Sequence, residues 1–307
     1  KGWEASITWG DSFTLASKPF NYRVMAGIGD NTSKVTKYDN PNRTLTDPYE
    51  GQQLGEIWGY VVDGYFKTDE EARNYKVDQS FVNQMINASA LDNGLHAGDL
   101  KFVDLDGNNK IEQTTSANDR KDMKVIGNSL PRYNYNFGIS ADWYGIDFSV
   151  LFQGIGKQNW YPGAETSMFW GPYSRPYASF IPSDFMSQVW SEENTDAYFP
   201  RPRGYVALGS NRELAVVNTK YLQNLAYCRL KNLSIGYTLP DKWLSKIGFE
   251  KIRVYFSGEN LLTFTKLHSD YIDPEQASAS NSWKTSKSDA NIYPWAKTYS
   301  FGVDITF

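Results

Sequence analysis

The last ten residues of the chain, 298–307, alternate strictly between apolar and polar side chains. Successive side chains of a β-strand point to opposite faces of a sheet, so this pattern predicts a strand with one apolar and one polar face. The strand ends on an aromatic side chain with no polar tail after it, which fits a membrane barrel or a soluble all-β domain. Its apolar face holds Tyr299, Phe301, Val303, Ile305 and Phe307.

The clearest predicted hairpin lies in the middle of the chain. Odd-numbered positions from Tyr133 to Trp143 are apolar, even-numbered ones are polar or small, and Tyr144-Gly145 then provides a very short turn. The alternation resumes from Ile146 to Phe152. Aromatic residues gather at the ends of this apolar face, as they do in membrane barrels, where aromatic girdles border an apolar band. A sandwich sheet would bury the same face, so the hairpin alone leaves both folds open.

Composition narrows the functional classes. The 307 residues carry a net charge of −4 with no block of Lys and Arg, which argues against nucleic-acid binding. The single cysteine, Cys228, excludes an internal disulfide. No apolar run approaches the ~18 residues that a membrane helix needs, but barrel strands need only about 9–11 alternating residues. Alternation already begins at Trp3 without a preceding signal peptide, so we expect a fragment.

Seven long strands are predicted, and short and long connections alternate strictly between them. Short turns fall near Ser17, Tyr144 and Asp241. In the strand after residue 225, Arg229 and Lys231 fall on the apolar parity, which fits only if they lie above the membrane or if a bulge shifts the register. The strands are near 2–9, 20–38, 132–143, 146–153, 225–239, 252–264 and 298–307, and the long loops span 39–130, 155–221 and 266–294.

Alternating connection lengths are typical of up-and-down membrane barrels, which have short turns at one end and long external loops at the other. A sheet of only seven strands would have two edge strands with unpaired backbone N–H and C=O groups. Such groups are costly in the hydrocarbon region of a membrane. We therefore predict an all-β fold: a transmembrane antiparallel up-and-down β-barrel segment with long structured extracellular loops. The first loop also predicts a short strand pair or a folded loop at 57–66, a capping box at Thr68–Glu71 and a short helix at 81–86.

Several motifs occur in order along nearly the whole chain. They lie at 98–104 with the acidic loop after it, 125–133, 152–154, 190–201, 227–237, 258–265 and 273–275, and they end with Phe307. These segments resemble the C-terminal portion of SusC-like (SusC/RagA) TonB-dependent outer-membrane transporters of the Bacteroidetes. The terminal Phe after a period-two strand resembles the last strand of bacterial outer-membrane barrels.

The resemblance implies that residues 1–307 are the last seven strands of a 22-stranded barrel, whose N-terminal strands and plug domain are absent from this chain. It further implies a SusD-like surface lipoprotein as a lid, TonB as the energy source acting through the absent N-terminal part, and the bacterial outer membrane as the location. The expected function is import of glycans or oligosaccharides, with peptides as the alternative. A rival of another class is a secreted all-β glycan-binding protein with buried apolar faces.

An acidic loop predicts a calcium site. Oxygen-bearing side chains occupy positions 1, 3, 5 and 9 of a calcium-loop pattern, and a backbone carbonyl supplies position 7. Asn109 stands where Gly is usual, and Thr115 stands where Glu is usual. The alternative is an Asp/Asn turn held by its own side chains. The predicted ligands are Asp104, Asp106, Asn108, the Lys110 carbonyl and Glu112.

The second long loop is rich in aromatic residues, which could stack on sugar rings or contact a partner protein. The alternative is that they pack against one another as the core of the loop. No catalytic motif is present, and His96 and His268 lie far apart in sequence, so we do not expect an enzyme. The predicted binding residues are Trp160, Tyr161, Phe169, Trp170 and Tyr173, with Tyr177 and Phe180 nearby.

Overall fold

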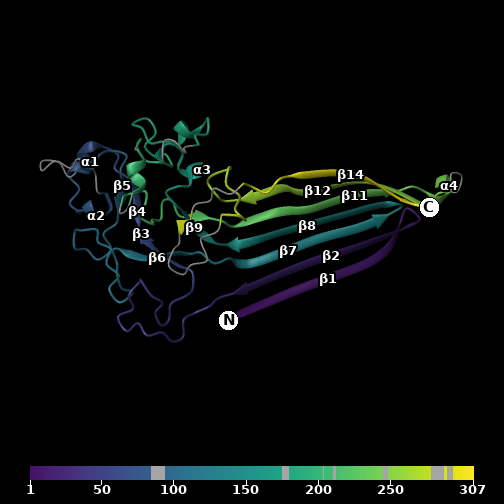
Figure 1. Cartoon of the computed structure of the whole chain (residues 1–307), viewed down its shortest axis with the longest axis horizontal. Helices are drawn as coiled ribbons and strands as arrows, with labels where there is room; N and C mark the ends of the chain where they lie inside the picture. Colours follow the sequence, from purple (N-terminus) through teal and green to yellow (C-terminus); the bar gives the residue numbers. More distant parts are fainter. Residues whose placement is uncertain are drawn as a thin grey trace.

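Seven long antiparallel strands form one sheet in a computed structural model, which describes residues 1–83, 94–174, 180–202, 204–209, 212–244, 248–277, 287–288 and 293–307. Each strand pairs with the next long strand along the chain, so the sheet is a meander with β1 and β14 at its two edges (Figure 1). Its strands are β1 (Gly2–Leu15), β2 (Lys18–Asn31), β7 (Arg132–Trp143), β8 (Ile146–Lys157), β11 (Tyr227–Thr238), β12 (Lys251–Thr265) and β14 (Thr298–Thr306).

All seven predicted strands are confirmed, but one was predicted too long. The sheet strand β2 ends at Asn31 rather than continuing to Tyr38. The chain then leaves the sheet, because Val35 donates its backbone N–H to the Gln52 carbonyl and so pairs with the first long loop. Strands β1 and β8 run several residues beyond the predicted ends at Trp9 and Phe152.

Two of the three short connections are two-residue turns in the left-handed backbone region. Ala16 and Ser17 have φ angles of 47° and 62°, and Tyr144 and Gly145 have φ angles of 50° and 83°. Turns with two positive φ angles match the twist of the flanking strands, so they suit tight hairpins. The third connection, at the short turn predicted near Asp241, holds α4 (Asp241–Leu244). All three lie at the end of the sheet opposite the long loops (Figure 1).

The sheet has one apolar face, and the described residues leave much of it exposed. Directly paired residues continue the apolar rows from strand to strand, as in Val24–Ile139–Val150. Phe301 and Ile7 are 83% and 65% exposed. The opposite face carries mostly polar and small side chains, such as Ser140, Ser149, Ser234, Ser257 and Ser300, whose mutual pairing crosses several strands.

A bulge in β11, one of the two alternatives for the parity of Arg229 and Lys231, is present. The register of β11 shifts between Leu230 and Asn232 against both neighbouring strands. This shift places Leu230 opposite Phe152 and Leu262, so the apolar row is restored, and Arg229 moves to the other face. Arg229 is 2% exposed.

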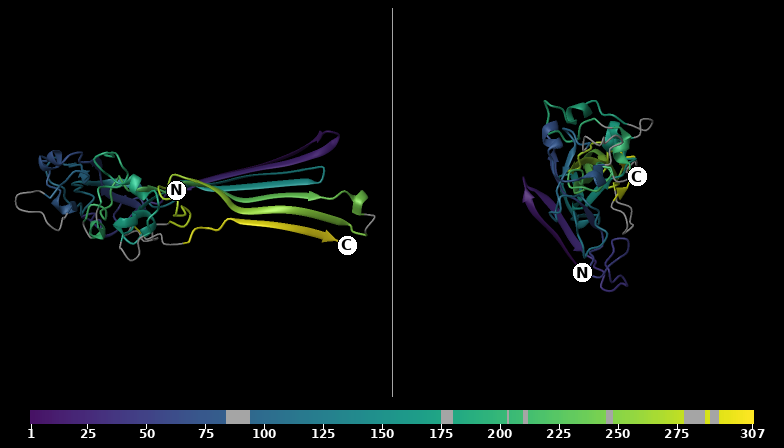
Figure 2. Two further views of the ribbon diagram at one scale, coloured as in Figure 1. Left: turned by 90° about the horizontal axis from the view of Figure 1, so that it is seen from above. Right: turned by 90° about the vertical axis from the view of Figure 1, so that its left-hand side faces the viewer.

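The described parts of the three long loops, 32–131, 158–226 and 266–297, gather into one compact body that we call the loop cap (Figures 1 and 2). Its short strands pair in three small sheets, and β3 and β4 pair with later strands rather than with each other, contrary to a simple strand pair within 57–66. The strands are β3 (Glu56–Tyr60), β4 (Val62–Tyr65), β5 (Leu100–Phe102), β6 (Met123–Asn128), β9 (Asn159–Pro162), β10 (Gln223–Asn224) and β13 (Lys287–Ser288).

Short helices complete the loop cap. The predicted N-cap is present at α1, where Thr68 Oγ1 accepts the Glu71 backbone N–H at 3.1 Å. The returning bond of a capping box is shifted by one residue, because the Glu71 carboxylate accepts the N–H of Lys67 at 2.8 Å rather than that of Thr68. The helix predicted at 81–86 begins one residue early as α2, and its residues 84–86 lie outside the described part of the chain. The helices are α1 (Asp69–Arg73), α2 (Ser80–Asn83), α3 (Ser167–Trp170), η1 (Gly171–Tyr173), η2 (Phe185–Gln188) and η3 (Tyr205–Leu208).

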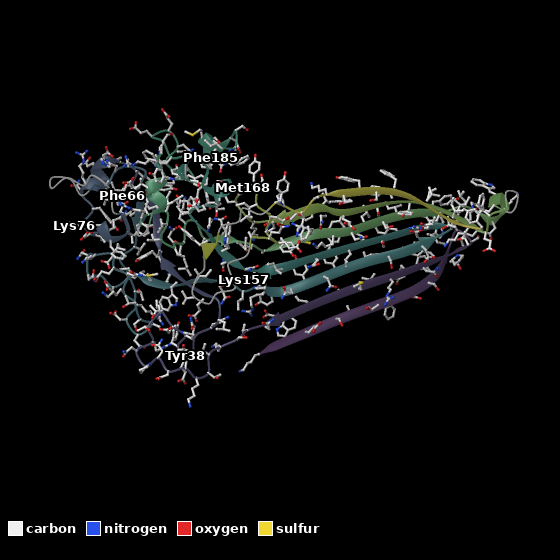
Figure 3. All side chains as sticks on the ribbon, in the orientation of Figure 1. Tyr38, Phe66, Lys76, Lys157, Met168 and Phe185 are labelled. Carbon is white, nitrogen blue, oxygen red and sulfur yellow. The ribbon has the colours of Figure 1, made fainter. Side chains whose placement is uncertain are left out.

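One hydrophobic core holds the loop cap together, and each of the three loops contributes to it. The first loop supplies Phe102, the second supplies Trp170 and Phe199, and the third supplies Leu267 and Ile272. Side chains fill this body densely around the labelled Met168 and Phe185 (Figure 3). Within the described residues, every helix is too short or too polar to cross a membrane.

Candidate functional site

A hollow of about 630 Å³ lies where the polar side of the sheet meets the loop cap. Asn134 and Asn136 of β7 and Gln153 of β8 supply amide groups to its lining, and Glu275 of the third loop supplies a carboxylate. Apolar side chains fill the rest of the lining, among them Met25, Leu151 and Ile155. Amide side chains both donate and accept hydrogen bonds, so this lining suits hydroxyl or amide groups of a polar ligand. In the sequence these residues showed only as the polar positions of an alternating strand, so we did not predict them as a site.

Close packing of β7 on β2 fixes one wall of this hollow. The Asn136 amide nitrogen lies 3.2 Å from the point that a Cβ at Gly27 would occupy. Gly27 and Asn136 are direct partners in the ladder, so the missing side chain leaves room for the amide to lie over the neighbouring strand. A larger residue at Gly27 would displace this amide, because a contact of 3.2 Å to a Cβ is tighter than packing normally allows.

A buried ionic cluster fastens the third loop over this hollow. Arg229 donates to Asp273 at 2.7 Å, to Glu275 at 2.6 Å and to the Thr263 hydroxyl at 3.0 Å. Lys231, the bulge residue of β11, donates to the same Glu275 carboxylate at 2.9 Å. The bulge therefore brings two cations to one side of the strand end, where they bind the acidic pair of the third loop.

The acidic loop is a turn held largely by its own side chains. The Asp104 carboxylate accepts the backbone N–H groups of Gly107 and Asn109, both at 2.7 Å. Asn109 has the left-handed φ of 62° that we expected at this position. The Asn108 Oδ1 accepts the Lys110 N–H, and the Glu112 carboxylate accepts from Lys121 and Asn108 rather than pointing to the other carboxylates.

Asp122, which the sequence analysis did not single out, completes the acidic cluster. Carboxylate oxygens of Asp104, Asp106 and Asp122 all lie within 4.8 Å of one another. Asp122 is fully buried and accepts the N–H groups of Leu105 and Glu112 at 2.9 and 2.7 Å. Two carboxylates of this turn and a third from a later segment form a set of hard oxygen donors that Ca²⁺ accepts.

Two carboxyl groups of this cluster have opposite pKa shifts. Burial raises the pKa of Asp122, and the nearby charges of Asp106 and Asp104 raise it further. At Asp104, desolvation is the largest effect, but the hydrogen bonds that its carboxylate accepts outweigh it and lower the pKa. A bound cation would relieve the repulsion among these groups, because it favours the charged form of all three.

All five predicted binding aromatics lie in the core of the loop cap. Trp160, Tyr161, Phe169, Trp170 and Tyr173 are each at most 2% exposed. Trp170 packs edge to face on Phe169, Phe199 and Tyr221, and the Tyr173 ring stacks on Phe199. Tyr161 donates its hydroxyl to the Leu214 carbonyl at 2.8 Å. In this arrangement they leave no free ring face for a ligand, and the alternative of a self-packed loop core describes them. Phe180 is 40% exposed, and Tyr177 lies outside the described residues.

His268 joins the second and third loops. Its ring stacks on Tyr198 with centroids 3.5 Å apart, and its Nε2 lies 2.8 Å from Gln188 Oε1. Burial lowers the pKa of His268. His96 lies apart from it, with its Nδ1 3.7 Å from the Asp69 carboxylate.

The sheet has an exposed apolar face and a polar opposite face, and its long loops gather at one end. These features define a segment of a transmembrane antiparallel up-and-down barrel, which is open in the described chain.

No protein-family profile matches the chain. It is 26% identical over 326 aligned positions to TonB-dependent receptor P3 and 25% identical over 335 to TonB-dependent receptor P39, both of Formosa agariphila. These alignments cover the whole chain and 28% and 30% of the two relatives.

Solved structures agree with this likeness. The RagAB peptide importer in its open-open state matches with a TM-score of 0.64 at 18% identity, and in its closed-closed state with 0.60 at 20% identity. Both matches cover the whole chain and 28% and 29% of the matched chains. The chain is thus similar along its whole length to TonB-dependent receptors, as predicted, and spans less than a third of the curated relatives that it matches.

Proposed function

We propose that the chain is the C-terminal barrel portion of a SusC-like outer-membrane transporter that imports glycans or oligosaccharides. A SusD-like surface lipoprotein would close the outer opening, and TonB would supply energy through an N-terminal plug and further strands, completing a barrel of 22 strands. The observation that carries this proposal is the sheet itself, whose apolar face is exposed from β1 to β14.

The exposed apolar face supports a membrane location. Residues such as Phe137, Ile139 and Val254 are more than 40% exposed and lie in continuous cross-strand rows. Monomeric soluble proteins rarely expose apolar patches larger than a few hundred Å². A secreted glycan-binding sandwich, the rival class, would bury this face against a second sheet, whereas the other sheets of the described chain belong to the loop cap.

The amide-lined hollow would lie inside the completed barrel, below the loop cap, where a substrate passes. Asn134, Asn136 and Gln153 can bind sugar hydroxyls, but they can also bind peptide groups. The structural neighbours are described as a peptide importer, so peptide transport is the alternative within the same class. Few charges line this hollow, which favours uncharged polar substrates.

Extraction of the native outer membrane tests the assignment. The full-length protein should require detergent and co-purify with a surface lipoprotein, and mass spectrometry should find this 35.0 kDa sequence within a much larger chain. A detergent-free, monomeric protein of 35.0 kDa would refute the membrane assignment.

Uptake measurements in cells test the substrate class. Cells carrying Asn136→Ala and Gln153→Ala should import fluorescent oligosaccharides more slowly than wild type, whereas Ser140→Ala, on the same face of β7 but outside the hollow lining, should match wild type. Slower peptide uptake with unchanged oligosaccharide uptake would favour the alternative.

We also propose that the acidic loop binds Ca²⁺ through Asp104, Asp106 and Asp122. The convergence of three carboxylates and the raised pKa of Asp122 support this assignment. Native protein should contain calcium by elemental analysis, and Asp122→Asn should lower that content, whereas Asp119→Asn should not. Equal calcium in wild type and Asp122→Asn would refute the site.

A further inference from the structure

A second hollow, of about 350 Å³, lies within the first long loop, away from the amide-lined one. Three parts of this loop build it: the turn at 43–51, the strand β3 and the segment 117–125. Its lining residues are Arg43, Tyr49, Gly51, Glu56, Trp58, Ala117, Arg120, Lys124 and Val125.

Positive charge dominates this hollow in an otherwise slightly acidic chain. Arg43, Arg120 and Lys124 form no salt bridge with the described residues. Glu56, the acidic residue of the lining, is already engaged: it accepts the Tyr49 hydroxyl at 2.6 Å and the Gln53 N–H at 2.9 Å. Burial, and secondarily Glu56, raise the pKa of Tyr49 to about 12, so Tyr49 keeps the proton that it donates.

Two buried N–H groups have no acceptor within normal hydrogen-bond distance among the described residues. Arg43 Nε and Trp58 Nε1 are both inaccessible to solvent, and Trp58 interacts only weakly with the Tyr49 hydroxyl, where it partly offsets the rise in the Tyr49 pKa. Buried polar groups in native proteins are almost always hydrogen-bonded, so each such group indicates an absent acceptor. Both groups only donate, as do the ends of Arg120 and Lys124.

The position of Arg43 is fixed from two sides. Its guanidinium stacks on the Tyr49 ring at 4.8 Å, and its carbonyl accepts the Ala117 N–H at 2.9 Å. Its backbone adopts φ of 48°, a left-handed conformation that is uncommon for a residue with a long side chain. The surroundings therefore hold this guanidinium in place before any ligand arrives.

We propose that this hollow binds an oxyanion, namely the phosphate, sulfate or carboxylate group of a larger molecule. Such a group supplies acceptor atoms for Arg43 Nε and Trp58 Nε1, and its charge neutralises the three cations. A guanidinium can also bind two oxygen atoms of the oxyanion with two parallel hydrogen bonds. The hollow is larger than a bare ion, so it has room for the atoms that carry the acidic group. The assignment does not depend on the transport proposal.

Calorimetric titration of the full-length detergent-solubilised receptor tests the site. The probes are sodium sulfate, sodium phosphate and glucuronate, each at an ionic strength matched with chloride. Arg43→Met removes the charge with little change in length, and Trp58→Phe removes the N–H but keeps a ring. Lys37→Gln, an exposed lysine of the same loop outside this lining, is the control.

At least one probe should bind more tightly than chloride, and both variants should weaken it about tenfold, as expected for lost hydrogen bonds to a charged group. An anionic lipid that co-purifies with wild type but not with Arg43→Met would identify a lipid headgroup as the source. Binding of the free probes alone would identify a small acid. If Arg43→Met fails to fold, Arg120→Gln and Lys124→Gln replace it, because both side chains are exposed. No binding, or equal binding in the variants and Lys37→Gln, would overturn the proposal.

Discussion

Replacement of Arg229 by Met should release the third loop from the sheet. The side chains of Arg229 and Asp273 are 2% and 4% exposed, so the substitution leaves a buried carboxylate without its cation. Removal of one partner from a buried ion pair costs about 3–5 kcal/mol. That cost corresponds to an increase in the population of the opened loop of about 10²- to 5 × 10³-fold.

Hydrogen exchange measures this opening directly. Backbone N–H groups of Gln276 and Ala277 donate to the Asp273 carbonyl, and that of His268 donates to Gln223 Oε1, so these amides are protected while the loop is closed. Their exchange in the full-length receptor should accelerate by the factor given above. Amides at the turn end of the sheet should keep their rates.

Lys231→Met is the matched control. Lys231 and Glu275 are about one-fifth exposed, so loss of this pair should cost about 1 kcal/mol or less and accelerate exchange about fivefold at most. Adding Asp273→Asn to Arg229→Met should restore part of the protection, because it removes the stranded charge. Unchanged exchange in Arg229→Met, or equal effects of the two single variants, would refute the assignment of the cluster as the fastening of this loop.

Three further predictions concern the sheet and the loop cap. Phe137→Arg should cost up to about 2–4 kcal/mol of barrel stability, because it places a charge in lipid. Asn136→Arg, on the polar face, should still assemble, and gel mobility with and without heating distinguishes the two variants. Equal assembly of both would contradict the outward orientation of Phe137. Gly138→Ala should destabilise the sheet by about 1–3 kcal/mol, because its Cβ would lie 2.9 Å from the Val150 backbone carbonyl oxygen of β8. Gly10→Ala, which meets nothing closer than 3.4 Å, is the control, and thermal unfolding in detergent compares the two. Burial lowers the pKa of His268 below its unfolded value of about 6.5, so the folded state binds fewer protons, and contact between the second and third loops should weaken as pH falls below about 6.5. His268→Gln should flatten that dependence when protease cleavage of the loops is followed from pH 7.5 to 5, and an unchanged profile would contradict it.

Most of the sheet could be predicted from the sequence because its physical signal is local. A period of two over ten or more residues needs no knowledge of distant partners. The wrong parity of Arg229 and Lys231 marked the irregular part of the strand, but it did not distinguish a bulge from a position above the membrane. The same local reasoning predicted α1 from Thr68 and Glu71. Local reasoning predicted the wrong end for β2. The residues after Asn31 pair with a later part of the first long loop, and a local sequence pattern does not identify such a distant partner.

The candidate sites were less predictable because they are built from separate segments. Asp122 joins Asp104 only after the chain between them folds back, so a fixed calcium-loop spacing could not include it. Trp160 and Trp170 are aromatic residues of a loop, and such residues can form either a binding surface or a core. Only their burial in the folded structure distinguishes the two roles. Asn134 and Asn136 were visible as polar strand positions, yet their importance depends on the third loop above them.

The shared core of the loop cap limits how relatives of this protein can diversify. Phe102, Trp170 and Ile272 come from three loops that are far apart in the gene, yet each helps to cover the same interior. A single loop exchanged for that of a relative would meet partners shaped for another sequence and leave apolar surface uncovered, whereas an exchange of all three together would preserve the packing. The three loops therefore constitute one heritable unit, and new specificities are expected to arise at its surface or by its replacement as a whole.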